Sequence, residues 1–208
     1  DDTGSPVRAA DGRGSRHNAA MLLTLPTMLT WARIVAIPLI VAVFYLPWSP
    51  AQINLTAAVL FVVVAATDWL DGWLARRLNQ TSAFGAFLDP VADKFLVCAS
   101  ILILLDLDRV SALVAFIIIG REIAISALRE WMAKIGASGN VAVHMLGKLK
   151  TATQMGAIVF LLLDADVFGL FHSLEVGTWL IYIACALTIW SMIYYLQKSL
   201  PDIRAKSR

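Results

Sequence analysis

Charged residues are scarce in this sequence: Asp, Glu, Lys and Arg make up 15% of its 208 residues, whereas 59% are hydrophobic. A soluble domain averages about 25% charged and roughly 45–50% apolar residues. The mean hydropathy of +0.74 reflects the same imbalance. The composition therefore excludes an ordinary soluble protein and predicts an integral membrane protein.

Cysteine is also scarce, because Cys98 and Cys185 are the two in the chain and each lies within an apolar run. Two cysteines so far apart in sequence form neither a disulfide framework nor a metal-ligand pattern. We interpret both as apolar packing residues. No small-residue cleavage site follows the first apolar run, so we expect no cleavable signal peptide.

The first twenty residues lack any apolar period and are rich in Gly, Ser, Asp and Arg. We expect residues 1–20 to be disordered. Their composition also fits a segment added for expression, with the native chain starting at Met21. Residues 21–208 are then expected to form a single membrane domain.

Long apolar runs fill most of that domain. A membrane-spanning helix needs about 20 mostly apolar residues. Six segments meet this requirement, at residues 26–46, 53–76, 84–105, 110–133, 141–163 and 175–197. The connections between them are short. We therefore predict an all-α, polytopic membrane protein, built as a bundle of six transmembrane helices.

Lys and Arg alternate between the connections, which indicates how the bundle is oriented. Lys and Arg residues lie before the first segment and after the second, fourth and sixth segments. The other connections contain a single basic residue, Arg109. The positive-inside rule then places both termini in the cytoplasm. Interfacial tryptophans fit this orientation, with Trp48 and Trp179 on the outer side and Trp131 on the inner side.

Four aspartates interrupt two of the apolar segments: Asp68 and Asp71 in the second, Asp89 and Asp93 in the third. At about 100° per residue, each pair lies on one face of its helix. A carboxylate at the centre of a spanning helix costs about 2.5–3.5 kcal/mol to insert, and four together repel one another. The nearby basic residues, Arg76, Arg77 and Lys94, are too few and too peripheral to neutralise them.

Divalent cations would compensate this charge. Carboxylate oxygens suit Mg²⁺, Mn²⁺ or Ca²⁺, and the absence of histidine or thiol beside them argues against zinc. The alternative is that the aspartates cap helix ends or pair with arginines at the interface. Gly72, Ala75 and Gly85 share the acidic faces. They indicate either close helix packing or space for a phosphate-bearing ligand against the backbone.

The spacing D-x2-D-G-x2-A-R-x8-G-x3-D-x3-D, from Asp68 to Asp93, resembles the signature of the CDP-alcohol phosphatidyltransferases. All of its fixed positions are matched. Residues 25–47, 120–133 and 141–155 further resemble the bacterial branch that makes phosphatidylglycerol phosphate, and the resemblance extends over residues 22–198. It implies transfer of a phosphatidyl group from CDP-diacylglycerol to sn-glycerol 3-phosphate, with release of CMP. It also implies a homodimer in the bacterial cytoplasmic membrane, with an active-site cavity facing the cytoplasm.

The resemblance assigns roles to the signature residues. Asp68, Asp71 and Asp89 are implied as the principal ligands of Mg²⁺ or Mn²⁺, with two ions per site. Asp93 completes the metal site and takes the proton from the acceptor hydroxyl, so Asp89 and Asp93 are the expected catalytic residues. The residues expected around CDP-diacylglycerol are Thr27, Thr30, Gly72, Ala75, Arg76, Ser82 and Gly85.

Basic residues inside the segments point to a phosphorylated acceptor. Charges in spanning helices normally face the interior or a water-filled cavity, and arginine offers a fork that binds phosphate through two hydrogen bonds. We predict that glycerol phosphate is bound by Arg33, Arg121, Lys148 and Lys150. For Arg33 the alternative is a structural pair with an aspartate. Glu122 is expected to pair with Arg121 or another basic neighbour.

Two other functions compete with this prediction. The signature alone does not separate glycerol phosphate from other acceptors, such as inositol phosphate, serine or choline. Acidic residues in spanning helices also mark ion pathways, so a divalent-cation transporter is the second alternative. The acids gather on one side of the membrane and no polar track continues beyond them, which favours the enzyme. The expected partners are CDP-diacylglycerol, sn-glycerol 3-phosphate and membrane lipids, with no nucleic acid.

Overall fold

A computed structural model describes residues 25–78, 83–134 and 144–206, so the predictions for residues 1–20 lie outside it. Within these ranges the chain forms six α-helices: α2 (Leu25–Val43), α3 (Pro50–Leu78), α4 (Ala83–Asp106), α5 (Ala112–Lys134), α6 (His144–Leu163) and α7 (Ser173–Lys206). The all-α class is confirmed, and each helix covers one predicted apolar segment. The largest difference is at α7, which continues past the predicted end at residue 197 to Lys206.

A short hairpin that the sequence did not predict joins α6 to α7. Its strands, β1 (Asp166–Val167) and β2 (Phe171–His172), pair antiparallel. Phe168 and Gly169 between them have φ values of 54° and 68°. Positive φ at both central residues is the backbone of a mirror-image turn, which suits the twist of a hairpin. Strands of two residues are too short to leave an alternating sequence pattern, so only a loop was expected here.

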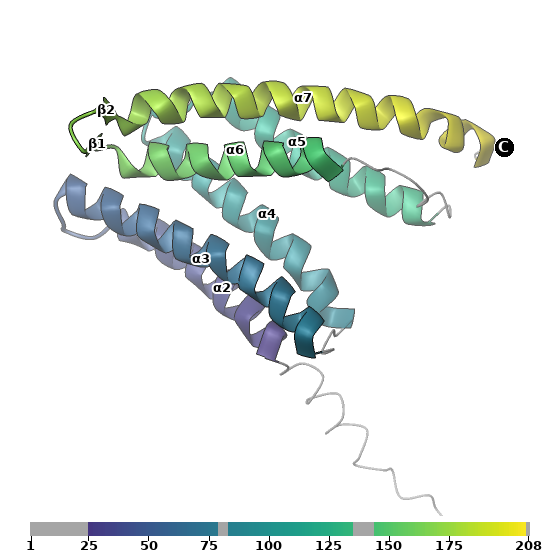
Figure 1. The fold of residues 1–208 in the computed structure, drawn as a ribbon, viewed down its shortest axis with the longest axis horizontal. Helices are drawn as coiled ribbons and strands as arrows, with labels where there is room; N and C mark the ends of the chain where they lie inside the picture. Colours follow the sequence, from purple (N-terminus) through teal and green to yellow (C-terminus); the bar gives the residue numbers. More distant parts are fainter. Residues whose placement is uncertain (1–24, 79–82, 135–143, 207–208) are drawn as a thin grey trace, which may run out of the picture.

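The helices gather at one end of the molecule and separate at the other (Figure 1). The gathered end, here called the closed end, holds the connections at residues 44–49, 107–111 and 164–172. Toward the opposite, open end, α2 and α3 diverge from α5, α6 and α7 as two arms. Helix α4 crosses between the arms and packs against α2, α5 and α6. The fold is therefore a wedge with charged residues available between its arms.

Local capping fixes where two helices start at the closed end. The backbone N–H of Ser49 donates to Gln52 Oε1 over 3.2 Å, and the N–H of Gln52 donates to Ser49 Oγ over 3.4 Å. This reciprocal arrangement satisfies two N–H groups that a helix start leaves unpaired. Pro50 follows as the first residue of α3, where a missing N–H costs nothing. Ser111 caps α5 in a similar way, accepting from the N–H of Val114.

Apolar packing holds the helices together. Phe61 of α3, Leu104 of α4, Ile118 of α5 and Ile158 of α6 are fully buried in one continuous core. Helices α6 and α7 approach closely at Gly177, where an added Cβ would lie 2.8 Å from Leu161 Cγ. Since real Cβ atoms do not come that close to carbon, glycine is what allows this contact.

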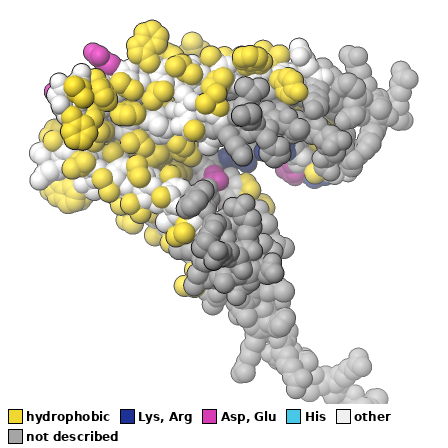
Figure 2. Space-filling view, in the orientation of Figure 1, with side chains coloured by type: hydrophobic (Ala, Val, Ile, Leu, Met, Phe, Trp, Pro, Cys, Tyr) yellow, Lys and Arg dark blue, Asp and Glu magenta, His cyan; other side chains and the backbone are white. Residues whose placement is uncertain are grey.

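The outer surface is strongly apolar. Large hydrophobic side chains are exposed on every helix, among them Trp31, Val63, Phe95, Phe116 and Trp190. Figure 2 shows hydrophobic side chains spread widely over the described residues of the face in view. Soluble monomers rarely expose apolar patches of this extent. Two stretches, Pro50–Thr67 and Ser173–Tyr194, are long and apolar enough to cross a membrane, while Thr30–Val43 and Leu149–Leu163 are apolar but shorter.

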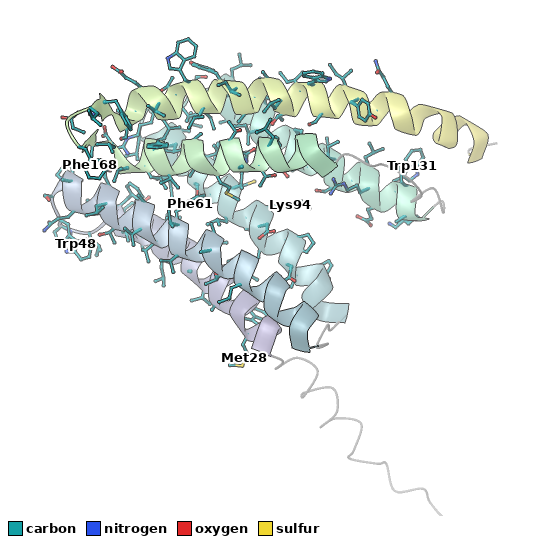
Figure 3. The ribbon with its side chains drawn as sticks, viewed as in Figure 1. Met28, Trp48, Phe61, Lys94, Trp131 and Phe168 are labelled. Carbon is teal, nitrogen blue, oxygen red and sulfur yellow. The ribbon has the colours of Figure 1, made fainter. Side chains whose placement is uncertain are left out.

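Two of the tryptophans, Trp48 and Trp131, lie at opposite ends of the wedge. Figure 3 places Trp48 and Phe168 at the closed end and Trp131 at the open end. Both tryptophans are partly exposed. The assignment of Trp48 to one membrane interface and Trp131 to the other stays a prediction.

Candidate active site

Two of the predicted catalytic carboxylates lie on α4 and contact α2. Asp89 and Asp93 are one helical turn apart, so they share a face. Thr30 Oγ1 donates a hydrogen bond of 2.6 Å to Asp89 Oδ1, and Arg33 Nη1 lies 3.1 Å from Asp93 Oδ1. Because Thr30 and Arg33 are also one turn apart, the two helices are joined by two matched contacts. Helix α2 thus positions both carboxylates.

The pair between Arg33 and Asp93 is buried on one side only. The Arg33 side chain is 0% exposed, whereas that of Asp93 is 44% exposed. A buried arginine needs a partner, and a carboxylate supplies one. The sequence left open whether Arg33 binds phosphate or pairs with an aspartate. The structure contains the pair with Asp93, and phosphate binding by Arg33 stays a prediction.

Helix α3 carries the other half of the signature. Asp68, Asp71, Gly72, Ala75 and Arg76 lie in its last turns. The structure describes these positions only as parts of a helix, without their contacts. The same holds for Thr27 in α2, Gly85 in α4 and Lys148 in α6, and Ser82 lies outside the described residues altogether. The roles predicted for these residues therefore stay predictions. Both acid-bearing helices, α3 and α4, pack against α2.

A second polar cluster joins α5, α6 and α7. We define the basic cluster as Arg121 and Glu122 of α5, Lys150 of α6 and Ser191 of α7. Arg121 Nη1 donates to Glu122 Oε1 over 3.0 Å, and Lys150 Nζ donates to the same oxygen. Arg121 Nη2 reaches Ser191 Oγ at 3.4 Å. The predicted pairing of Glu122 with Arg121 or a basic neighbour is confirmed, since it contacts both cations.

The basic cluster is largely withdrawn from solvent. The side chains of Arg121, Glu122 and Lys150 are 11%, 16% and 4% exposed. Figure 2 shows acidic and basic side chains in a recess between the two arms. The described residues thus form two separate charged groups, carboxylates of α4 that contact α2 and cations that join α5, α6 and α7. Such a pairing suits a ligand that carries both metal-binding and anionic groups.

A third polar cluster lies at the closed end, around Arg109. Its Nη1 donates to the carbonyl oxygens of Leu161 and Leu162 over 2.9 and 3.1 Å. Its Nη2 donates to Asp164 Oδ2 over 2.8 Å and to Asn54 Oδ1 over 3.0 Å. The last carbonyls of a helix have no partner within the helix, and Arg109 supplies one at the end of α6.

The charge of Arg109 is stable despite its burial. Burial lowers the pKa of its guanidinium, and the adjacent Asp164 carboxylate raises it. An arginine pKa starts so high that the group stays protonated. The sequence identified Arg109 only as the single basic residue of the outer connections. The one indication of the role of Arg109 in the sequence was its position among the four aspartates of these connections. Its contacts with backbone carbonyl oxygens leave no pattern in the sequence.

Comparison with known proteins identifies the family of this chain. Residues 23–190 match the family model described as CDP-alcohol phosphatidyltransferase. The chain is 48% identical over 188 residues to the CDP-diacylglycerol–glycerol-3-phosphate 3-phosphatidyltransferase of Yersinia enterocolitica, an alignment that covers 88% of this chain and 98% of the relative. Proteins of the same name from Yersinia pestis and Shigella flexneri are 47% and 46% identical, with the same coverage. The family predicted from the signature is confirmed, and this chain belongs to the CDP-alcohol phosphatidyltransferase family.

Proposed function

We propose that this chain transfers the phosphatidyl group of CDP-diacylglycerol to sn-glycerol 3-phosphate, forming phosphatidylglycerol phosphate and CMP. The observation that carries the proposal is the identity of 46–48% to relatives named for this reaction, over 88% of the chain. The two charged groups, the carboxylates of α4 and the basic cluster, support it, because the reaction needs a site for a pyrophosphate and a site for a second phosphate.

We further propose that the six helices span the bacterial cytoplasmic membrane, with both termini and the open end on the cytoplasmic side. The exposed apolar side chains on all six helices support this placement. Lys and Arg lie at the helix ends that flank the connections of the open end, such as Arg76 and Arg77 of α3 and Lys134 of α5, as the positive-inside rule requires. The soluble acceptor and CMP would then enter and leave between the arms. A homodimer is proposed from the family resemblance alone.

The proposed metal ligands are Asp68, Asp71, Asp89 and Asp93, with Mg²⁺ or Mn²⁺ as the ions. Asp89 and Asp93 fit such a site, since they present carboxylate oxygens from one helix face and hard divalent cations prefer oxygen ligands. Among the described residues, no set of three or more His, Cys, Asp and Glu side chains forms a metal-binding group. When bound, the ions would neutralise negative charge on the pyrophosphate.

The chain's own residues then orient the reactants. The acceptor hydroxyl attacks the β-phosphorus of CDP-diacylglycerol, the bond from that phosphorus to the CMP oxygen breaks, and CMP leaves with the electron pair. Asp93 is proposed to take the hydroxyl proton, and Arg33 orients its carboxylate through Oδ1. The cytidine and its phosphates are proposed to lie against the glycine-bearing faces of α3 and α4. The basic cluster is proposed to hold the phosphate of the acceptor.

Replacement of Arg121 by alanine tests the acceptor site. We expect the KM for glycerol 3-phosphate to rise roughly tenfold or more, because a hydrogen bond between charged groups contributes about 1.5–3 kcal/mol. The KM for CDP-diacylglycerol is expected to change little. Initial rates of CMP release against each substrate measure both constants. Lys134→Ala, which removes an exposed cation from the same helix, is the control. An equal rise in both constants would exclude a specific role in acceptor binding.

Replacement of Thr30 by valine tests how α2 positions the catalytic carboxylates. Valine has nearly the shape of threonine but does not donate the 2.6 Å hydrogen bond to Asp89. We expect kcat to fall roughly tenfold, because a hydrogen bond to a charged group is lost. Thr30→Ser, which keeps the hydroxyl, should retain most of the rate. If valine and serine variants have the same kcat, the hydroxyl does not matter for catalysis.

The proposed function is tested directly with purified protein in detergent. CMP release from CDP-diacylglycerol is measured with glycerol 3-phosphate, inositol phosphate, inositol or serine as the acceptor, each with Mg²⁺ and with EDTA. We expect release with glycerol 3-phosphate and loss of that release in EDTA. Metal-dependent release with a different alcohol would keep the family chemistry and change the acceptor. Absence of release with every acceptor, from folded protein, would contradict the proposal.

A further inference from the structure

Glu122 is an acidic residue within a cluster for which we propose phosphate binding. Its Oε1 accepts hydrogen bonds from both Arg121 and Lys150, so one oxygen links cations from α5 and α6. A carboxylate in this place repels an arriving phosphate. Neither the substrate nor the catalytic carboxylates explain why an acidic residue lies here. The function of Glu122 therefore needs a separate explanation.

Burial explains why the cluster contains a counterion. Two cations withdrawn from water repel each other and lose hydration, and breaking a buried pair by removing one partner is strongly destabilising. Lys150 and Arg121 are both nearly buried. Without a bound anion, Glu122 is the carboxylate that neutralises part of their charge. It keeps the two cations close together before phosphate binds.

The cations nevertheless keep capacity for a second anion. An arginine has five N–H donors and a lysine three. In the described part of the chain, Arg121 Nε is buried and has no hydrogen-bond partner. A buried donor without a partner is costly. A phosphate beside Arg121 would satisfy it, and the ion pair with Glu122 does not.

We propose that Glu122 is an exchangeable counterion: it holds Arg121 and Lys150 in position before phosphate binds and competes with the phosphate group that binds them. The inference rests on the proposed function. In that reaction the phosphate of the acceptor is retained in the product, so the same cations must first bind it and then release it. Glu122 limits how tightly they hold it. It is a positioning residue, since it is not among the groups that react.

The charge balance gives the direction of the effect. Arg121 and Lys150 carry two positive charges and Glu122 one negative charge, which leaves one net positive charge. Glu122→Gln keeps the size and an oxygen acceptor but leaves two positive charges for the phosphate. Interactions between charges are stronger in a poorly solvated site than in water. The variant should therefore bind phosphate more tightly and release it more slowly.

The experiment measures binding and turnover on the same purified protein. Isothermal titration with inorganic phosphate should give a dissociation constant roughly tenfold lower for Glu122→Gln than for the original chain. The KM for glycerol 3-phosphate and kcat should both fall. Loss of structure alone would lower kcat without lowering KM. Glu130→Gln is the matched control, since it removes a carboxylate of the same helix that pairs with Lys134 and is exposed.

Several outcomes would overturn the proposal. Folded Glu122→Gln protein with unchanged or weaker phosphate binding would do so. If that variant does not fold, Glu122→Asp keeps the charge but withdraws it by one methylene, and tighter phosphate binding is again expected. Unchanged binding in Glu122→Asp would then count against exchange. Failure of the proposed function is seen separately, as absence of CMP release with glycerol 3-phosphate from the original chain. Phosphate titration needs no catalysis and still tests Glu122 in that case.

Discussion

Replacement of Asp89 by asparagine is expected to reduce CMP release roughly a thousandfold, because a carboxylate that supports metal binding contributes several kcal/mol of charge stabilisation. Asparagine has the same shape and keeps an oxygen that accepts the hydrogen bond from Thr30. The contact between α2 and α4 should survive, so the variant should fold. Initial rates with saturating Mg²⁺, compared with the thermal unfolding midpoint in detergent, separate lost chemistry from lost structure.

Asp106→Asn provides the control for this prediction. Asp106 is the last residue of α4 and is exposed. The Asp106→Asn substitution removes one negative charge from α4, as Asp89→Asn does, but at the opposite end of the helix from the signature residues. Its rate should equal that of the original chain. Turnover by Asp89→Asn at close to the original rate would exclude Asp89 as an essential metal ligand.

Replacement of Arg109 by alanine is expected to lower the free energy of unfolding by roughly 2–4 kcal/mol, because it leaves a partly buried carboxylate and several oxygen acceptors without their donor. The affected groups are Asp164, Asn54 and the carbonyl oxygens of Leu161 and Leu162. They connect α3, α6 and the connection before α5 at the closed end. Thermal or denaturant unfolding in detergent measures the change.

The matched comparison is Lys134→Ala, which breaks the exposed pair with Glu130 at the open end. Exposed pairs within a helix contribute little, so no measurable change in unfolding is expected. Arg109→Ala should also keep its rate per folded molecule, because Arg109 lies far from the signature residues, at the other end of the wedge. Equal unfolding midpoints for Arg109→Ala and the original chain would show that the Arg109 contacts do not stabilise the closed end.

The number of helices was predictable from the sequence for a physical reason. In lipid, each backbone polar group must be satisfied within the chain, so an apolar run of sufficient length forms a helix. The runs at residues 53–76 and 84–105 became α3 and α4 almost unchanged. The hairpin at Asp166–His172 was missed because its strands are too short to show a period. The last helix was longer than predicted because polar residues after residue 197 continue it beyond the apolar run.

The candidate site was predictable as a set of residues and not as a set of contacts. The signature identified Asp89 and Asp93, and helical periodicity placed them on one face. Periodicity does not say which helix packs against that face. The contacts of Thr30 with Asp89 and of Arg33 with Asp93 depend on α2 lying beside α4, which follows from the three-dimensional packing.

The basic cluster shows the same limit of sequence reasoning. Arg121 and Lys150 were recognised as charges inside apolar segments, and Glu122 as a partner for a basic residue. Arg121 and Lys150 both donate to one oxygen of Glu122, and this depends on the approach of α5 to α6 and α7. The resulting question, why a phosphate site contains an acid, arises only from this arrangement.

The central claim is that this chain joins a phosphatidyl group to glycerol 3-phosphate, and one measurement tests it most directly. Purified protein is given CDP-diacylglycerol, deuterated sn-glycerol 3-phosphate and Mg²⁺, and the lipid products are analysed by mass spectrometry. The account predicts phosphatidylglycerol phosphate carrying the deuterium, formed in equal amount with CMP and absent in EDTA. CMP accompanied by unlabelled phosphatidic acid would show hydrolysis in place of transfer. That result, or the absence of any labelled lipid from folded protein, would contradict the claim.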